Sequence, residues 1–374
     1  IEIDTSDPSG INYPKCISLL KKYLIKLQFE VEIHSIPEDV ALGKNRQHLI
    51  GRRFISTSLP TLLIYNHIDV VPADYPEAFT FSIKNGKVYG RGASDHKGGT
   101  VAVLSALEAL KDKKLRFNIV FWATTDEETK QLKQLEYMTD KLKLPANTLV
   151  YDTDTFAGGI TVAHIGQFNF KIAVKGKSTH SAMSNLGKNA IEEAAKLISY
   201  LQTIKKKYES QKSKYKAFPS SGLRFVCSRC NVNTIHGGSV YNTVPDTCEI
   251  HIDCRYIPEA DVLKEKERLL QVINTFCRMN NIDFKILDSY SIEGYGNITS
   301  YATELNKIYS KISGDGGLYC ILGSNDLVPW TKEMNLPHFG LGVARGDTNV
   351  HGKNEFVYLK DIENLDITLR QFLT

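Results

Sequence analysis

TLLIYNHIDVVP, residues 61–72, joins an apolar run directly to a histidine and an aspartate two positions apart. Shorter apolar runs lie at residues 118–123 and 148–151, and the segment 101–110 between them is rich in Ala and Leu and free of breakers. That composition favours a helix, whereas the apolar runs are typical of buried strands. Such strands alternating with helices predict an α/β domain with a mixed, mostly parallel sheet flanked by helices.

A different pattern begins near residue 166. Polar and apolar side chains alternate at residues 168–175 and 247–253, as expected for a sheet with one face in water. Helices are expected at 189–201 and 261–279. We therefore predict that residues 166–279 form a separate α+β domain inserted into the first.

The α/β pattern resumes after this insertion, with helices expected at 298–312 and 359–372. The first domain should thus comprise residues 1–165 and 280–374. A chain of 374 residues is too long for one ordinary core, and 42% hydrophobic with 24% charged residues is typical of a soluble globular protein.

Charge does not point to a polyanionic partner. The net charge is only +4, and the densest basic stretch, residues 204–216, also contains Glu and Ser. We interpret that stretch as a solvated helix end or loop, and we expect no nucleic-acid partner.

The chain has the features of a cytoplasmic protein. No apolar run approaches the roughly 18 residues of a membrane span, and a signal-peptide core is missing, so neither membrane insertion nor export is expected. The seven scattered cysteines fit reduced thiols better than a disulfide framework. The sequence begins with Ile1 rather than Met, which leaves open whether N-terminal residues are missing.

Five segments carry side chains that bind metals. Imidazoles and carboxylates without thiolates suit a divalent ion kept partly open for chemistry. Several follow apolar runs, and ligands gather at the carboxyl ends of strands in α/β sheets. Any one could be an ordinary loop residue, but together they predict a dinuclear metal centre. The candidates are His67 and Asp69, Asp95 in GRGASDHKGG, Glu127 and Glu128 in TTDEET, Asp152 or Asp154 in VYDTDT, and His351 in VHGKNEF.

Asp69 and the Glu pair have expected roles of their own. Asp69 stands two residues beyond His67, where it can accept a hydrogen bond from the second ring nitrogen and orient the ring. The alternative is a surface aspartate. Adjacent residues of an extended segment point opposite ways, so one glutamate can face a metal while the other faces the attacking water.

These motifs resemble the dinuclear zinc amidohydrolases, a family that includes acetylornithine deacetylase, succinyl-diaminopimelate desuccinylase, aminoacylase, several dipeptidases and carboxypeptidase G2-like enzymes. The resemblance runs from IDTSDPSG at residues 3–10 to His351. It includes KGKSTHSAMSNLGKNAIE (175–192) and HGGSVYNTVPDTCEIHIDCR (236–255), which are similar to the family's lid domain. It implies that the first domain is catalytic and that the inserted domain is a lid and dimerisation domain.

The resemblance also implies the metal ligands. Asp95 would bridge two divalent ions, with His67 and Asp152 completing one and Glu128 and His351 the other. Glu127 would be the general base. The ions would be zinc, with cobalt or manganese as alternatives, because first-row ions compete for such sites.

Two positions near the metals remain open. Asp154, two residues after Asp152, is the alternative to it as a ligand. His96 stands where methionine is usual in the family, and it is either an added ligand or a packing residue. An aspartate at the fourth ligand position is more frequent among the dipeptidases, which shifts some weight toward peptide substrates.

In the lid, the resemblance makes His180 the histidine that reaches an active site, usually the partner subunit's, to stabilise an oxyanion. Arg255 and Asn242 would hold a substrate carboxylate and carbonyl, opposite the backbone of Gly323. The alternatives are a surface histidine and an arginine paired with a neighbour such as Asp253 or Glu249. A homodimer formed through the lid is expected.

The resulting expectation is a metal-dependent amidohydrolase that cleaves the amide bond of a small N-acyl amino acid. The alternatives are a dipeptidase, aminopeptidase or carboxypeptidase acting on short peptides and, less favoured, a non-catalytic metal-binding protein. The sequence does not specify the acyl group, the amino acid or the native metal.

Overall fold

In the computed structural model, which describes residues 1–41, 43–129 and 131–374, the apolar run at 61–67 forms strand β3 (Thr61–His67) inside the largest sheet. Every side chain of β3 is buried. It runs parallel to both of its neighbours, β6 (Asn118–Thr124) and β7 (Thr148–Asp152). The three predicted strands therefore lie side by side and end at the same edge.

Alternate residues of these strands pack into different cores. Leu62 and Ile64 of β3 belong to one hydrophobic cluster, whereas Leu63 and Tyr65 belong to another. A strand with apolar side chains on both faces must be covered on both faces. One face is covered by α1 (Tyr13–Lys26), α2 (Gly98–Ala109), α6 (Ser300–Ser313) and α8 (Leu359–Phe372), and the other by α3 (Leu132–Leu142) and α7 (Leu327–Glu333).

The large sheet is mixed, as predicted, with antiparallel strands at its edges. Among the described residues it has eleven strands. Their order is β1 (Glu30–Ser35), β2 (Gln47–Arg53), β6, β3, β7, β19 (His338–Gly340), β8 (Ile160–His164), β18 (Leu318–Ile321), β11 (Lys212–Ala217) and β12 (Phe225–Cys227), with β17 (Tyr295–Gly296) pairing with β8. A small sheet of β4 (Ser82–Lys84), β5 (Lys87–Tyr89) and β20 (Phe356–Tyr358) lies beside it.

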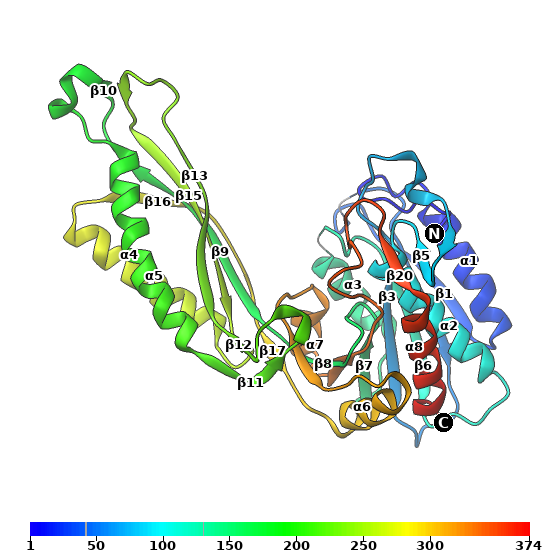
Figure 1. The fold of residues 1–374 in the computed structure, drawn as a ribbon. Helices are drawn as coiled ribbons and strands as arrows, with labels where there is room; N and C mark the ends of the chain where they lie inside the picture. Colours follow the sequence, from blue (N-terminus) through cyan, green and yellow to red (C-terminus); the bar gives the residue numbers. More distant parts are fainter. Residues whose placement is uncertain (42, 130) are drawn as a thin grey trace.

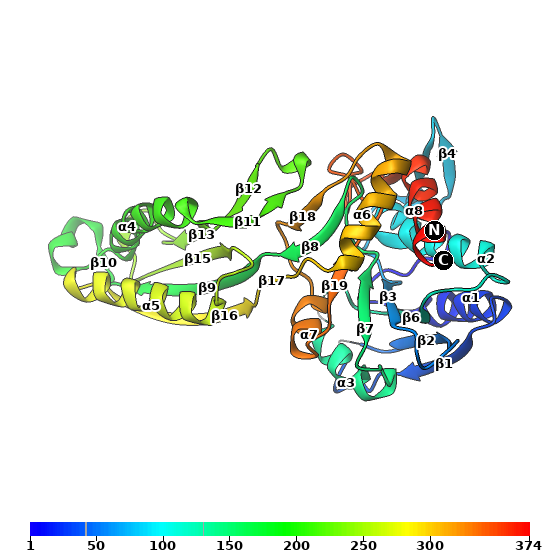
Figure 2. The same ribbon diagram turned by 90° about the horizontal axis from the view of Figure 1, so that it is seen from below.

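The inserted domain is an arm that extends away from the first domain (Figures 1 and 2). Its sheet has the order β13 (Arg229–Gly237), β15 (Thr247–Tyr256), β9 (Gly166–Lys175) and β16 (Asp283–Ile292), all antiparallel. Helices α4 (Ala190–Ser210) and α5 (Val262–Met279) pack on one face through a separate hydrophobic cluster. The short pair β10 (Thr179–His180) and β14 (Thr243–Val244) forms its far tip.

The predicted domain boundaries differ from the observed sheets in two places. Strand β16 lies beyond the predicted boundary at residue 279, yet it pairs with β9 along its whole length and so belongs to the arm. Strands β11 and β12 lie inside 166–279, yet β11 pairs in parallel with β18 and extends the large sheet. Lys212, Lys214 and Lys216 point to solvent on β11, so the basic stretch predicted as a solvated helix end or loop partly forms a strand.

Within the described residues, none of the helices is both long enough and apolar enough to cross a bilayer.

Candidate metal centre

The carboxyl ends of β3, β6 and β7 place the candidate ligands at one edge of the sheet. His67 is the last residue of β3, Glu127 and Glu128 follow β6, and Asp154 follows β7. Because parallel strands end on the same side, side chains that are far apart in the sequence meet there. Asp95, in the turn before α2, and His351, in the loop before β20, complete the set.

Asp95 lies between two groups of potential ligands. Its Oδ1 is 3.2 Å from Nε2 of His67, and its Oδ2 is 3.1 Å from Nε2 of His351. One group consists of His67, Glu127 and Asp154, and the other of Asp95, Glu128 and His351, with the ligand atoms of each group within 4.8 Å of one another. Each oxygen of one carboxylate thus faces a different imidazole, as a bridging ligand requires.

The structure corrects the expected position of Asp152. Oδ2 of Asp154, not a carboxylate oxygen of Asp152, lies 3.9 Å from Nε2 of His67. Asp152 ends β7 with a fully buried side chain, and its Oδ1 accepts a 2.9 Å hydrogen bond from the backbone N–H of Asp154. This local bond turns the chain at the strand end, so that Asp154 faces the metal centre and Asp152 faces the interior.

His96 packs against the centre instead of completing it. Its ring stacks on that of His67 with centroids 4.3 Å apart, and its Nε2 lies 3.3 Å from Oγ1 of Thr100. It falls in neither of the two ligand groups found among the described residues. The packing alternative therefore describes this position.

Asp69 contacts both neighbouring ligands. Nδ1 of His67 lies 3.2 Å from the backbone carbonyl oxygen of Asp69 and 3.5 Å from its Oδ1. Oδ2 of Asp69 accepts a 3.0 Å hydrogen bond from the backbone N–H of Glu128. Oε2 of Glu128 in turn lies 3.0 Å from Nε2 of His351. The aspartate is therefore placed to orient the ring of His67 and the chain at Glu128 together.

A buried ion-pair network shapes the turn before the two glutamates. Asp126 has a positive φ of 64°, which is uncommon for a residue other than glycine. Its Oδ1 accepts a 2.7 Å hydrogen bond from Nε of Arg46, a fully buried arginine that also binds Asp7. These contacts hold the left-handed turn that directs Glu127 and Glu128 into different ligand groups.

Glu355 and Arg91 position the centre, although sequence reasoning did not single them out. The carboxylate of Glu355 accepts hydrogen bonds of 3.0, 3.0 and 3.1 Å from the backbone N–H groups of Gly92, Ser94 and Asp95. Arg91 binds Glu355 at 2.8 Å and donates to the carbonyl of His351 at 3.1 Å. Both residues stand inside the two quoted motifs, GRGASDHKGG and VHGKNEF, but their contact across the fold is visible only in three dimensions.

The electrostatics of the site fit divalent cations. Burial raises the pKa of Glu127 well above its usual range, and the neighbouring Asp154 raises it further. Hydrogen bonds with Asp95 and Glu128 raise the pKa of His351 to about 10. The four crowded carboxylates thus create a negative potential, which favours the protonated forms of Glu127 and His351. Two dications would offset the four negative charges, and the two imidazoles complete an oxygen and nitrogen donor set of the kind that zinc binds.

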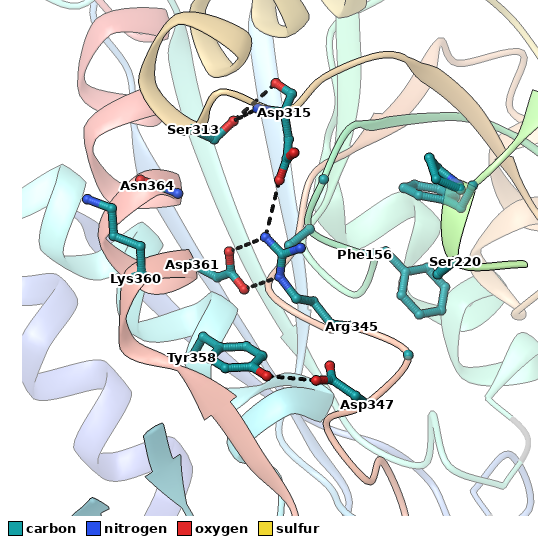
Figure 3. Close-up of a pocket in the computed structure, with 15 residues that line it drawn as sticks. Phe156, Ser220, Ser313, Asp315, Arg345, Asp347, Tyr358, Lys360, Asp361 and Asn364 are labelled. Atoms are coloured by element: carbon teal, nitrogen blue, oxygen red, sulfur yellow. Dashed lines mark hydrogen bonds and ion pairs between the residues drawn. The ribbon is translucent and has the colours of Figure 1, made fainter. Parts of the chain in front are cut away.

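Two adjoining cavities open beside the centre. A cavity of about 320 Å³ is lined by Asp95, Asp154 and residues of the loop before His351. It shares Phe156, Arg345 and Gly346 with a neighbouring cavity of about 760 Å³. In the larger cavity, the guanidinium of Arg345 lies between Asp361 and Asp315, opposite the ring of Phe156 (Figure 3).

The predicted substrate contacts do not lie together within one chain. His180 and Asn242 lie at the tip of the arm, where the backbone N–H of Ser181 donates to the carbonyl of Asn242. Arg255 lies at the root of the arm, where its guanidinium donates hydrogen bonds of 2.7 and 3.1 Å to the carboxylate of Asp253. That pairing is the alternative named for this arginine. Gly323 follows β18, where an added Cβ would lie in ordinary van der Waals contact with Cγ2 of Ile321, at 3.7 Å.

Known proteins match most of the chain. Residues 63–374 match the family described as Peptidase family M20/M25/M40. A probable succinyl-diaminopimelate desuccinylase of Staphylococcus aureus is 28% identical over 292 residues, or 70% of this chain and 68% of the relative. An acetylornithine deacetylase of Proteus mirabilis is 30% identical over 251 residues, or 65% of this chain and 60% of the relative. The matched region therefore spans about two thirds of these relatives or less.

Solved structures share the whole fold. A tripeptidase of Staphylococcus aureus superposes with a TM-score of 0.77 at 21% identity, covering 100% of this chain and 94% of that one. Aminopeptidase PepT of Bacillus cereus gives the same TM-score at 18% identity and the same coverage. At such identities the likeness establishes the fold alone.

Replacing Glu355 should weaken the metal centre. In Glu355→Gln, an amide N–H₂ replaces one of the oxygens that accept from the turn of Asp95, so metal affinity should fall by about 10–100-fold, as for other residues that support ligands. Competition with a chromophoric chelator would measure it. Glu304→Gln removes a similar pairing, with Arg116, outside both ligand groups and serves as the control. Equal affinities in the two variants would contradict a positioning role for Glu355.

Proposed function

The chain belongs to the peptidase family M20/M25/M40, and on this basis we propose that it hydrolyses the amide bond of an N-acyl amino acid. Family membership and the two ligand groups make it a dinuclear metal hydrolase that acts on C–N bonds. The observation that carries the proposal is the position of Asp95, whose two oxygens each face a different group of ligands.

We assign the ligands from this geometry. Asp95 would bridge the ions, His67 and Asp154 would complete one, and Glu128 and His351 the other. We propose zinc, with cobalt or manganese as alternatives, because oxygen and nitrogen ligands bind all three. When bound, the two ions supply a Lewis acid for the acyl oxygen and lower the pKa of a water molecule.

Glu127 is the proposed general base. Its carboxylate lies beside His67 and Asp154, and the raised pKa of this buried group favours a proton acceptor that can also return a proton. It would take the proton from the attacking water and deliver it to the leaving amine. Glu128 is less suited to this role because its carboxylate contacts His351 at 3.0 Å.

The names of the relatives support two substrate classes. The desuccinylase and the deacetylase are named for the removal of acyl groups and are more similar in sequence. The tripeptidase and PepT are the structures with a TM-score of 0.77. We favour N-acyl amino acids for this reason. A dipeptidase, aminopeptidase or carboxypeptidase is the second candidate, supported by an aspartate, Asp154, at the fourth ligand position.

A homodimer with shared sites is part of the proposal, because the length of the arm separates the expected substrate contacts. Thr247, at the tip end of β15, pairs with Lys175, whereas Arg255 pairs with Gln167 beside the root. Eight residues of extended strand span about 27 Å. His180 and Asn242, beyond Thr247, could therefore meet a small substrate held near Arg255 only if they came from a second copy.

Exposed apolar side chains at the tip support contact between two arms. Met183, Leu186, Val240 and Tyr241 are each at least half exposed, and Tyr241 is 99% exposed. Apolar side chains gathered on one surface are typical of an interaction site. In such a dimer, His180 of one subunit would stabilise the oxyanion formed in the other subunit's site.

Metal content and substrate class test the core of the proposal. Wild-type protein should contain two divalent ions in this centre, and Asp95→Ala should lose metal and activity together because the carboxylate serves both ligand groups. Metal analysis should accompany a screen of N-acyl amino acids and dipeptides. Full activity after exhaustive chelation would overturn the proposal, and turnover of dipeptides alone would favour the second candidate.

The two adjacent glutamates should behave differently. Glu127→Gln keeps the shape but removes the proton acceptor, so activity should fall by about 10²–10⁴-fold with little change in metal content. Glu128→Gln, the matched variant, should lower metal content instead. The opposite pattern, with metal lost only in Glu127→Gln, would show that the two roles are exchanged.

Hybrid dimers test whether His180 acts across subunits. Glu127→Gln and His180→Ala homodimers should both be nearly inactive. A heterodimer of one Glu127→Gln chain and one His180→Ala chain can be isolated with two affinity tags. It should recover about half of the wild-type turnover, because one of its two sites contains both Glu127 and His180. A heterodimer of wild type with Glu127→Gln gives the reference value. If the first heterodimer stays inactive, His180 acts within its own chain. A fully active His180→Ala homodimer would show that His180 does not take part in turnover.

A further inference from the structure

A second cluster of potential ligands lies inside the large sheet, apart from the metal centre. Asp152, His164 and His338 come from β7, β8 and β19, and β19 lies between the other two strands. Their exposures are 0%, 2% and 1%. Two imidazoles and a carboxylate are therefore brought together in the interior by three different segments of the chain.

Each of these side chains has a buried polar atom without a hydrogen bond. Oδ2 of Asp152, Nε2 of His164 and Nε2 of His338 make no hydrogen bond with any described residue. The three side chains offer ligand atoms within 4.8 Å of one another, and Oδ2 of Asp152 is 3.5 Å from Nε2 of His338. A buried polar atom without a hydrogen bond destabilises the folded protein, so three in one place indicate a missing partner.

We propose that Asp152, His164 and His338 bind a third divalent cation, of the zinc class, separate from the dinuclear centre. Zinc takes imidazole nitrogen and carboxylate oxygen at about 2.0–2.2 Å in tetrahedral sites, which puts neighbouring ligand atoms about 3.3–3.6 Å apart. The 3.5 Å between Asp152 and His338 matches this spacing. A fourth position would remain for a water molecule.

The remaining polar atoms of two of the ligands are already engaged. Oδ1 of Asp152 accepts from the backbone N–H of Asp154, and Nδ1 of His338 lies 3.5 Å from Oγ1 of Thr331. Such outer contacts fix the direction of metal ligands.

The cluster lies at the root of the arm, where an ion would act as a structural tie. His164 ends β8 and pairs with Tyr295 of β17, and these two strands carry the chain into and out of the arm (Figure 2). The hydroxyl of Tyr295 accepts a 2.9 Å hydrogen bond from the backbone N–H of His338. An ion at this point would join the root of the arm to the strand end that presents Asp154.

The test uses a chain in which the dinuclear centre is disabled. In Asp95→Ala/His67→Ala/His351→Ala, which removes both imidazoles and the central carboxylate of that centre, elemental analysis should find about one zinc ion per chain after equilibration with zinc and removal of excess metal. Adding His164→Phe or His338→Phe, which keep a ring but remove the nitrogens, should abolish this binding. His48→Phe is the matched control, because His48 is also buried with an unpartnered ring nitrogen but belongs to none of the three ligand groups.

The outcomes separate this proposal from that of the catalytic centre. A folded Asp95→Ala/His67→Ala/His351→Ala protein without zinc overturns the third site, as does zinc that persists in both Phe variants. Either result leaves the dinuclear centre untouched. Should the Phe variants fail to fold, cobalt in the triple alanine variant decides, because a tetrahedral site with two imidazoles gives strong visible absorption bands. Absence of those bands would also overturn the proposal.

Discussion

The crowding of four carboxylates at one edge of a sheet is the constraint on which the rest of the site depends. Asp95, Glu127, Glu128 and Asp154 lie near two imidazoles in a largely buried place, where uncompensated charge is costly. Bound cations or protons must therefore compensate the charge at this edge. Hydrogen bonds from the surrounding chain keep the carboxylates apart and fix their directions. Glu355 accepts one from the backbone N–H of Asp95, and Arg46 donates one to Asp126. Residues from the beginning, middle and end of the chain thus take part in positioning the same four carboxylates.

Much of the architecture followed from the sequence because its signals are local. The strands at 61–67, 118–124 and 148–152 are continuous apolar runs, and α8 occupies the predicted residues 359–372. Strand β11 was missed because Lys212, Lys214 and Lys216 form its exposed face, and this alternation was interpreted as a basic helix end or loop. Strand β16 of the arm was missed because a strand's sheet is decided by its pairing partner, here β9, and not by its local sequence pattern.

At the site, residue types were predictable but directions were not. The motifs and the family resemblance pointed to His67, Asp95, Glu128 and His351, which the structure brings together. The choice between Asp152 and Asp154 depended on a single hydrogen bond after the strand end, which no periodicity reveals. Glu355 illustrates a different limit: its partners lie about 260 residues away, in the turn of Asp95. A hydrogen bond between residues so far apart produces no local sequence pattern around Glu355.

The strand β11 also has a mechanical consequence. An inserted domain usually joins its host through two strands and can swing about them as about a hinge. Here the chain passes between the two bodies four times: from β8 to β9, from α4 to β11, from β12 to β13 and from β16 to β17. Four tethers, spread over β8, β17 and the β11–β12 edge of the large sheet, oppose rotation in more than one direction. The arm should then keep a fixed orientation relative to the first domain. The geometry of a dimer formed through the tip of the arm would therefore be determined by the fold of the single chain.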